Sequence, residues 1–260
     1  MEIIALANQK GGVGKTTTAA ALWHGLGQRG RHVLAIDLDA QGNLSYSARA
    51  KQGRGIPSIM GVLMGEADID SAIQQTSSGD IIPSTPGLNA ADSIFSQTGR
   101  EFLLRNILRE LGDRYDDVVI DTPPALGIMT VNALVAAEAV IIPASCEVYS
   151  IQAIQQVAKA VSTLHPDFNP LVRVTGILLT KYNGRNTITR EAERLIEEQA
   201  HNLHTIIYKS RIREGVAVKE AQIVRQPLAS YAPKSKPAQD YKDFIDEIEK
   251  QRESFTNEQV

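Results

Sequence analysis

The residues best suited to chemistry form one short stretch, Lys10–Thr17, with the sequence KGGVGKTT. The apolar run Ile3–Ala7 precedes it, and the helix-forming run Ala19–Trp23 follows it. Glycines between a strand and a helix let successive backbone N–H groups point at one anion, toward which the helix N-terminus also points. The stretch therefore predicts a phosphate-binding loop in which Lys15 reaches the β- and γ-phosphates and the Thr16 hydroxyl binds Mg²⁺. The predicted nucleotide contacts in this loop are Lys10, Gly11, Gly12, Val13, Gly14, Lys15, Thr16 and Thr17.

Two further stretches end in carboxylates. The buried-type strand at 32–37 ends in Asp37 and continues through Asp39 in the sequence DLDAQGN, and the strand at 115–121 ends in Asp121 of the sequence DTPP. Ligands bind at the carboxyl ends of strands in α/β sheets, so we expect the three aspartates to lie beside the glycine-rich loop. For Asp37 and Asp39 the alternative is that they are N-capping or solvated residues.

The motifs KGGVGKTT, DLDAQGN and DTPP together resemble those of the ParA/MinD family of P-loop ATPases, whose deviant Walker A box contains the extra lysine found here at position 10. Gln9 stands where the usual pattern G-x-x-x-x-G-K-[ST] has glycine. Ala40 replaces a proline common in the ParA/Soj branch, which we expect to alter loop stiffness more than chemistry. The resemblance implies a slow ATPase with ATP and Mg²⁺ as cofactors.

The resemblance also implies roles for single residues. Lys10 crosses a dimer interface to the partner's nucleotide, and Asp39 orients the attacking water. Asp37 holds the water shell of the metal, and Asp121 at the Walker B position accepts hydrogen bonds from water on Mg²⁺. The predicted catalytic residues are thus Lys10, Lys15 and Asp39, and the predicted metal residues are Thr16, Asp37 and Asp121.

Adenine contacts in this family follow a later strand, which we expect at 172–180. Lys181 and Asn183 are the candidate contacts in the polar stretch after this strand. An ordinary polar loop is the alternative.

Apolar strand-type runs alternate with helical patterns along the chain, which predicts an α/β P-loop NTPase fold with a mostly parallel twisted sheet flanked by helices. No linker or repeat divides the 260 residues. We therefore predict one ParA-like ATPase domain over 1–260, with an acidic helix and tail at about 238–260. The further strands are expected at 81–83 and 139–143, and the helices at 15–30, 56–64, 71–75, 100–111, 151–164 and 187–200.

Composition excludes several classes of protein. No apolar run approaches the ~18 residues that a membrane span requires. Cys146 is the only cysteine, which excludes an intrachain disulfide, suits a reducing cytosol and argues against nitrogenase-type iron proteins, which need two cysteines per subunit. No basic and apolar leader precedes the first strand, so we expect no signal peptide and a cytoplasmic location.

The family branch is indicated by the two ends of the chain. MinD-like proteins end in a basic amphipathic helix that lies on membranes, whereas Phe244–Lys250 here has an apolar face opposite an acidic one, so we expect no membrane partner. No helix-turn-helix segment precedes the first strand. These features resemble Soj-type chromosomal and small plasmid ParA proteins.

That resemblance implies a nucleoid-associated partitioning ATPase. Its ATP-bound homodimer binds DNA non-specifically and is released when a ParB-like centromere-binding protein stimulates hydrolysis. Two alternatives remain. One is a MinD-like positioning ATPase for a membrane or polar cargo, and the other is a metabolic P-loop transferase, which requires a small-molecule pocket.

Charge is distributed unevenly near the end of the chain. Residues 204–237 contain seven basic and two acidic residues, a net +5, although the whole chain has a net charge of −3. Lys209, Arg211 and Arg213 alternate on an expected extended segment, which places them on one face as a phosphate-binding strip beside Lys219 and Arg225. The alternative is a solvated surface on which these residues pair with acids.

Overall fold

Eight strands form one sheet across residues 1–147 and 149–258, which the computed structural model describes; residues 259 and 260 of the predicted acidic tail lie outside them. The order across the sheet is β3-β4-β2-β5-β1-β6-β7-β8, and every pairing is parallel except that of β3 with β4. The strands are β1 Glu2–Leu6, β2 Val33–Asp37, β3 Gln74–Thr76, β4 Gly79–Ile82, β5 Asp117–Asp121, β6 Ala139–Ser145, β7 Arg173–Tyr182 and β8 Ile207–Arg213.

Helices cover both faces of this sheet, which confirms the predicted mostly parallel α/β architecture. The helices are α1 Lys15–Gly27, α2 Asn43–Ser47, α3 Ile59–Met64, α4 Ile69–Ala72, α5 Ala91–Ile94, α6 Leu103–Arg109, α7 Ile128–Ala136, α8 Tyr149–Leu164, α9 Thr187–Asn202, α10 Val216–Val224, α11 Leu228–Tyr231 and α12 Lys236–Glu258, with short 3₁₀ turns at Pro86–Ala90 and Arg100–Phe102.

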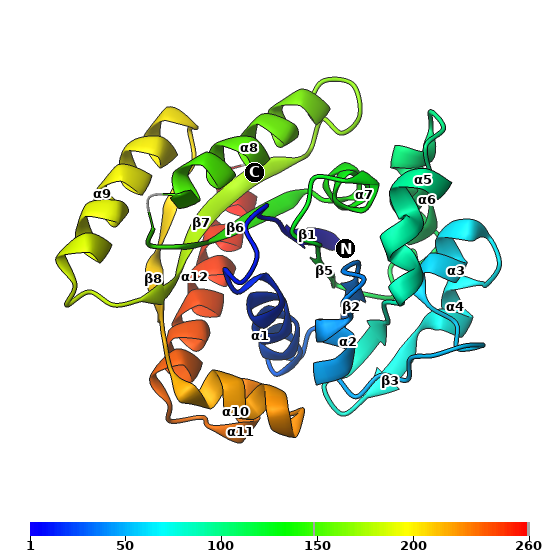
Figure 1. Ribbon diagram of the computed structural model, residues 1–260, viewed down its shortest axis with the longest axis horizontal. Coiled ribbons are helices and arrows are strands. Elements are labelled where there is room, and N and C mark those ends of the chain that lie inside the picture. The colour runs from blue at the N-terminus through cyan, green and yellow to red at the C-terminus, as the bar shows by residue number, and fades with distance from the viewer. Residues whose placement is uncertain (148, 259–260) are drawn as a thin grey trace.

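Two hydrophobic clusters lie on opposite faces of the sheet. Side chains from α3, α6, α7, α8 and α9 build one cluster, and those from α1, α2 and α12 build the other. In Figure 1, α7 and α8 accordingly lie above the strands β6 and β7, and α1 lies below them. Strands covered on both sides are apolar along their whole length, which is why β2 and β5 are buried at every position.

Most helix boundaries differ from the sequence prediction by a few residues, as at 56–64 and 100–111, where the α-helices are Ile59–Met64 and Leu103–Arg109. Two further differences have a clear cause. The helix expected at 71–75 ends at Ala72, because Gln74–Thr76 instead pairs antiparallel with β4 as the edge strand β3. The helix expected at 15–30 ends at Gly27, and Gly30 follows in a turn with φ +84°, a conformation that favours glycine. Neither difference affects the carboxyl ends of the central strands.

The C-terminal helix α12 contributes to the central core. Phe244 is fully buried, and its ring packs edge-on against Tyr208 of β8 with centroids 4.9 Å apart. The Tyr241 hydroxyl lies 3.1 Å from that of Thr18 in α1. Near the end of the helix, Arg252 binds the buried carboxylate of Asp117 at 3.0 Å. The terminal helix thus packs on the first helix and on the edge strand β8, and it reaches the start of the central strand β5.

The single-domain prediction is testable at Phe244. Phe244→Ala should lower the free energy of unfolding by about 3–5 kcal/mol, because it removes a buried ring and leaves a cavity. Urea denaturation followed by circular dichroism should still show one transition. Lys242→Ala, an exposed change on the same helix, should alter stability by less than about 0.5 kcal/mol. A separate early transition in the Phe244 variant would show that α12 folds independently of the sheet.

Candidate nucleotide-binding site

The loop between β1 and α1 has the backbone of an anion-binding turn. Gly12 and Gly14 have φ values of +72° and +86°, which favour glycine. Thr180 at the end of β7 supports the loop from behind, with its hydroxyl donating to the Val13 carbonyl at 2.8 Å. The Asn8 side chain accepts from the Lys10 N–H at 2.8 Å. Sequence reasoning missed Asn8 and Thr180, although Asn8 directly precedes the motif.

Lys15 is the buried cation of the site. Its side chain is turned inward from the first residue of α1, and its ammonium donates to the Lys10 carbonyl at 3.3 Å. Burial lowers the pKa of Lys15, and the negative charges of Asp121 and Asp39 oppose that shift. Lys15, Asp39 and Asp121 are therefore brought together, as the sequence predicts.

Asp37 and Asp121 occupy paired register positions at the ends of the neighbouring strands β2 and β5, and both are fully buried. Asp37 accepts from the N–H and hydroxyl of Ser45, at 2.8 and 2.6 Å. Even so, burial raises the pKa of Asp37 to about 6. Burial, and then the charge of Asp37, raise the pKa of Asp121 well above its usual range.

These carboxylates fit a magnesium-nucleotide site. Neither oxygen of Asp121 makes a hydrogen bond of normal geometry in the described residues, although Thr16 and Lys15 lie close enough to oppose the rise of its pKa. Oxygen donors and unpartnered acceptors suit Mg²⁺, which keeps several waters and shares substrate phosphates. The described residues contain no group of three His, Cys, Asp or Glu side chains that could hold a metal alone, so phosphate oxygens would complete the shell. When bound, Mg²⁺ neutralises charge on the phosphates.

Asp39 lies in the turn that follows β2. Its carboxylate accepts from the Gln41 N–H at 3.0 Å, and its backbone carbonyl accepts from the Gly42 N–H at 2.8 Å and from the Ser84 hydroxyl. The turn is thus held to the end of β4, where Ser84 lies. This places the carboxylate close enough to influence Lys15, as a residue that orients water requires.

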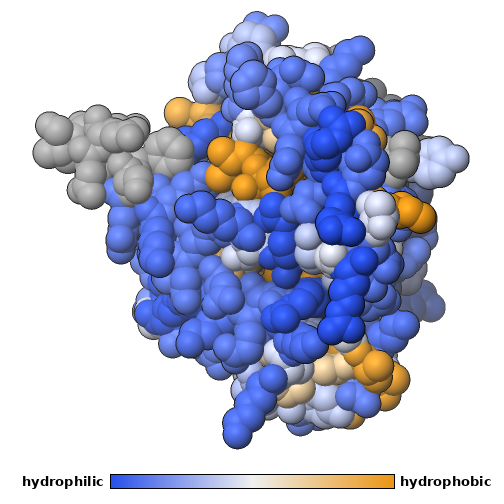
Figure 2. Space-filling model, turned by 90° about the vertical axis from the view of Figure 1, so that its left-hand side faces the viewer, coloured by the Kyte–Doolittle hydropathy of each residue, from blue (hydrophilic) through white to orange (hydrophobic). Residues whose placement is uncertain are grey.

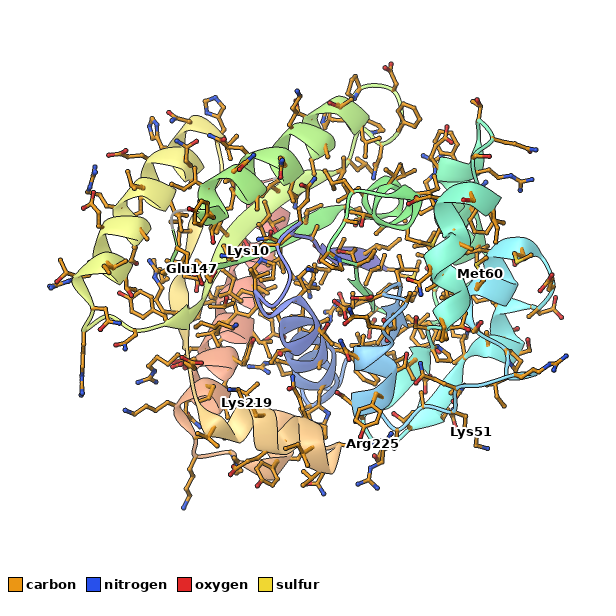
Figure 3. All side chains as sticks on the ribbon, viewed as in Figure 1. Lys10, Lys51, Met60, Glu147, Lys219 and Arg225 are labelled. Atoms are coloured by element: carbon orange, nitrogen blue, oxygen red, sulfur yellow. The ribbon has the colours of Figure 1, made fainter. Side chains whose placement is uncertain are left out.

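Lys10 has a different environment from Lys15. Its ammonium forms an ion pair with Glu147 and lies 3.5 Å from the Ser145 hydroxyl, and both partners belong to the region at the end of β6 (Figure 3). The Lys10 side chain is 29% exposed and that of Glu147 is 56% exposed. Hydrogen bonding from Lys10 lowers the pKa of Glu147. The structure therefore separates the two loop lysines, one facing the buried carboxylates and one lying near solvent.

The two adenine candidates lie in different surroundings. Lys181 has a left-handed backbone with φ +50°, and its ammonium lies 3.9 Å from where a Cβ on Gly12 would be. Asn183 lies in an exposed turn and accepts from the Arg185 N–H at 3.3 Å. Lys181 is thus close to the loop, whereas both adenine assignments remain predictions.

Two of the three basic side chains of the predicted strip on β8 are paired with acids. Arg211 pairs with Glu193 of α9 at 2.7 Å, whereas the Nε–H of Arg213 donates to both carboxylate oxygens of Asp240 in α12, at 2.9 and 3.1 Å. Both arginines are thus paired with acids, as the alternative of a paired, solvated surface has it, and the assignment of these residues to DNA stays a prediction. Of the three, only Lys209 has no side-chain partner in the described residues. The face of the molecule drawn in Figure 2 is largely hydrophilic.

The remaining DNA candidates lie on or next to α10. Lys219 is exposed on this helix. Arg225 ends it in a left-handed conformation, and its guanidinium lies 3.6 Å from the centroid of the Tyr46 ring. The structure thus separates Lys219 and Arg225 from the paired arginines of β8.

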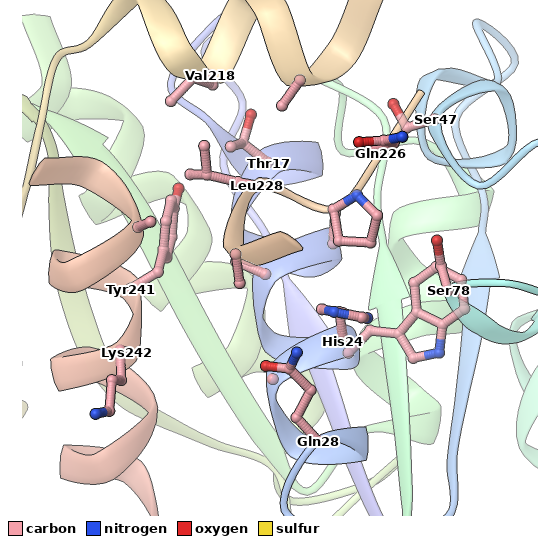
Figure 4. Close-up of a pocket in the computed structure, with 18 of the residues that line it drawn as sticks. Thr17, His24, Gln28, Ser47, Ser78, Val218, Gln226, Leu228, Tyr241 and Lys242 are labelled. Carbon is pink, nitrogen blue, oxygen red and sulfur yellow. The ribbon is translucent and has the colours of Figure 1, made fainter. Parts of the chain in front are cut away.

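A cavity of about 330 Å³ lies beside α1, between this helix and the segment α10–α12 (Figure 4). Thr16 and Thr17 border it, and Trp23, His24 and Tyr241 form part of its wall. Burial lowers the pKa of His24. Lys10, Lys15, Asp39 and Asp121 do not line the cavity, so it is separate from the predicted γ-phosphate position.

A glycine-rich loop between a strand and a helix, with buried carboxylates at the ends of the adjacent parallel strands, defines a P-loop ATPase. The chain matches the AAA domain family over residues 1–174, and the family of 4Fe-4S iron sulfur cluster binding proteins of the NifH/frxC type over residues 117–260. Because such clusters are held by several cysteine thiolates, the single Cys146 does not provide the ligands for one.

Relatives identify the family more closely. The chain is 35% identical to the chromosome partitioning protein ParA of Myxococcus xanthus, over 92% of this chain and 84% of that protein. It is 33% identical to the sporulation initiation inhibitor protein Soj of Bacillus subtilis, over 95% and 98% of the two chains. The chain belongs to the ParA/Soj family of P-loop ATPases, which confirms the resemblance inferred from the motifs.

Solved structures agree with this assignment. Cobyrinic acid a,c-diamide synthase from Mycobacterium smegmatis, with bound ADP and magnesium, is 32% identical with a TM-score of 0.81, covering 95% of this chain and 93% of that one. The cell division ATPase MinD of Pyrococcus furiosus is 26% identical with a TM-score of 0.78, covering 96% and 99%. The protein is an ATPase, with ATP and Mg²⁺ as its cofactors, as predicted.

The assignment of Lys15 is tested by nucleotide affinity. Lys15→Ala should weaken Mg²⁺-ATP binding by a factor of about 100, because it removes a charged hydrogen-bond donor worth about 1.5–3 kcal/mol. Isothermal titration calorimetry measures this directly. Lys159→Ala, an exposed lysine on α8, should bind ATP like the parent. Equal affinity in the two variants would remove Lys15 from the site.

Proposed function

We propose that this chain is a DNA-partitioning ATPase of the nucleoid. The supporting observation is its 35% identity over 92% of its length to a chromosome partitioning protein. In this proposal ATP joins two copies face to face, and the dimer binds DNA without reading its sequence. A ParB-like centromere-binding protein then stimulates hydrolysis and releases the dimer.

The two lysines support the proposed dimer. Lys15 is buried among the carboxylates of its own chain. Lys10 lies near solvent, and its pair with Glu147 is largely exposed, which limits the contribution of the pair to about 0–1 kcal/mol. The phosphates of the ATP bound to a second subunit can therefore replace Glu147 as the partner of Lys10 at little cost in free energy. Lys10 acts across the interface in this scheme, and Asp39 orients the attacking water within its own chain.

A MinD-like role at a membrane is the second candidate, which the similarity to Pyrococcus furiosus MinD supports. The acidic face of α12 argues against it. Asp246 and Glu249 pair with Arg29 of α1, and Glu247 accepts from the Lys209 and Ser210 N–H groups at the β8 edge. Both faces of α12 are thus engaged within the chain. No helix in the described residues has the length and apolar character of a membrane span.

A metabolic transferase is the third candidate, because the Mycobacterium smegmatis structure is named a cobyrinic acid a,c-diamide synthase. Such an enzyme must hold a small molecule near the γ-phosphate. The cavity beside α1 is not lined by Lys15, Asp39 or Asp121. A molecule within it would not contact these residues, which favours the partitioning role.

The dimerisation of two variants tests the roles proposed for Lys10 and Asp39. Lys10→Ala should bind ATP as a monomer and neither dimerise nor hydrolyse it, because the charge that crosses the interface is lost. Asp39→Ala should form an ATP-bound dimer that persists, because no carboxylate orients the attacking water. Size-exclusion chromatography with Mg²⁺-ATP distinguishes the two. If both variants stay monomeric, or both dimerise, one of the two roles is misassigned.

The function is tested by sedimentation with mixed-sequence DNA and with anionic vesicles. The protein with ATP should sediment with DNA, and binding should fall steeply with salt because phosphate contacts release counterions. Protein with ADP should stay in solution. Sedimentation with vesicles but not with DNA would favour the membrane role, and sedimentation with neither would argue against both.

A further inference from the structure

Two segments of the chain contain basic residues and no acidic residue of their own. Residues 40–65 contain Arg49, Lys51 and Arg54 and no aspartate or glutamate. Residues 221–239 contain three basic residues, beginning with Arg225, and likewise no acid. In a chain with a net charge of −3, such segments produce a positive field only where they lie together.

The fold joins these segments at the C-terminal end of α10. Arg49, directly after α2, donates to the carbonyls of Val224 and Arg225, at 2.9 and 3.2 Å. In return, the Arg225 guanidinium covers the ring of Tyr46 on α2. A cation at the C-terminus of a helix is favourable, because the last carbonyls carry partial negative charge. Two arginines thus fix the loop after α2 against α10.

The cations of this region are available to a ligand. Lys51 and Arg54 are exposed in the loop, and Lys219 is exposed on α10. None of these three side chains has a hydrogen-bond or ion-pair partner in the described residues, whereas Arg211 and Arg213 on β8 are both paired with acids. In Figure 3, Lys51, Arg225 and Lys219 lie along one lower edge of the molecule.

The same loop is attached to the nucleotide site. Gln52 donates to the Ser84 carbonyl at 3.2 Å, and the Ser84 hydroxyl donates to the carbonyl of Asp39. The Gln52 side chain also packs against Gly42, where an added Cβ would lie 2.5 Å from its amide nitrogen. The position of Lys51 and Arg54 therefore depends on the turn that holds the predicted water-orienting carboxylate.

We propose that Arg49, Lys51 and Arg54, together with Lys219 and Arg225, form a DNA-phosphate surface, here named the α2–α10 surface. The inference rests on the proposed function and specifies where the DNA lies. Guanidinium and ammonium groups suit phosphate oxygens, and the stacking of Arg225 on Tyr46 keeps its planar fork oriented. Phosphate contacts of this kind carry no sequence readout, as non-specific binding requires.

The double variant Lys51→Ala/Arg54→Ala tests this surface, because neither side chain supports the fold through a polar contact. Fluorescence anisotropy with labelled duplex DNA and a non-hydrolysable ATP analogue, from about 50 to 200 mM salt, gives the dependence of log K on log salt. Because the dimer carries the surface twice, the double variant loses up to four phosphate contacts, which should reduce the magnitude of the slope by about 3.6. Arg109→Ala/Lys159→Ala removes two exposed charges from α6 and α8 and is the matched control.

The outcomes separate this inference from the proposed function. A weaker double variant with a flattened slope, an unchanged control and an unchanged melting temperature supports the surface. A double variant that binds DNA like the parent overturns the surface alone. A parent protein that fails to bind DNA overturns the proposed function and this inference with it. Since Val216 and Ile223 are exposed on α10, anionic phosphatidylglycerol vesicles form a further arm; loss of vesicle binding without loss of DNA binding also overturns the surface.

Discussion

Negative charge buried at one edge of the sheet is the constraint on which the rest of the site depends. The register pairs Asp37 with Asp121 at the ends of β2 and β5, and both carboxylates are fully buried. Burial favours their protonated forms, so their pKa values rise. The positive charge of Lys15 opposes the rise in the pKa of Asp121, while burial lowers the pKa of Lys15 itself. A divalent cation with its water shell supplies the missing positive charge, which is a physical reason for this edge of the sheet to bind a magnesium nucleotide.

The parallel topology explains why so much of this could be predicted. In a parallel sheet the strands end at the same edge, and because β2, β5 and β1 are neighbours in the strand order, Asp37, Asp121 and the loop after β1 converge there. Side-chain pairings between distant segments follow no such rule. Arg211 forms an ion pair with Glu193, and Arg213 with Asp240, because α9 and α12 pack beside the edge strand β8. Alternation along β8 could not indicate these helices, so the pairing of two of the three basic side chains could not be predicted from the sequence.

Burial also separates two lysines that the sequence places five residues apart. Lys15 begins α1, and its side chain turns inward. Lys10 lies on the open side of the loop, where Glu147, 137 residues away, neutralises it. A largely exposed pair of this kind contributes about 0–1 kcal/mol, so exchanging the carboxylate for a phosphate costs little. The motif alone identified Lys10 as special, whereas its partner within the same chain could only come from the fold.

The short helix α2 connects the chemistry to the surface. Ser45, near its start, donates twice to Asp37, and Tyr46 and Arg49 at its far end hold the C-terminus of α10. Gln222 of α10 in turn donates to Thr17 of the phosphate loop at 3.2 Å, across the cavity beside α1. A packed core resists small displacements, whereas a segment next to a cavity has room to move. The C-terminal part of α10 is thus attached both to the segment that follows α2 and to Thr17. The α2–α10 surface is therefore joined through hydrogen bonds to both loops of the predicted nucleotide site.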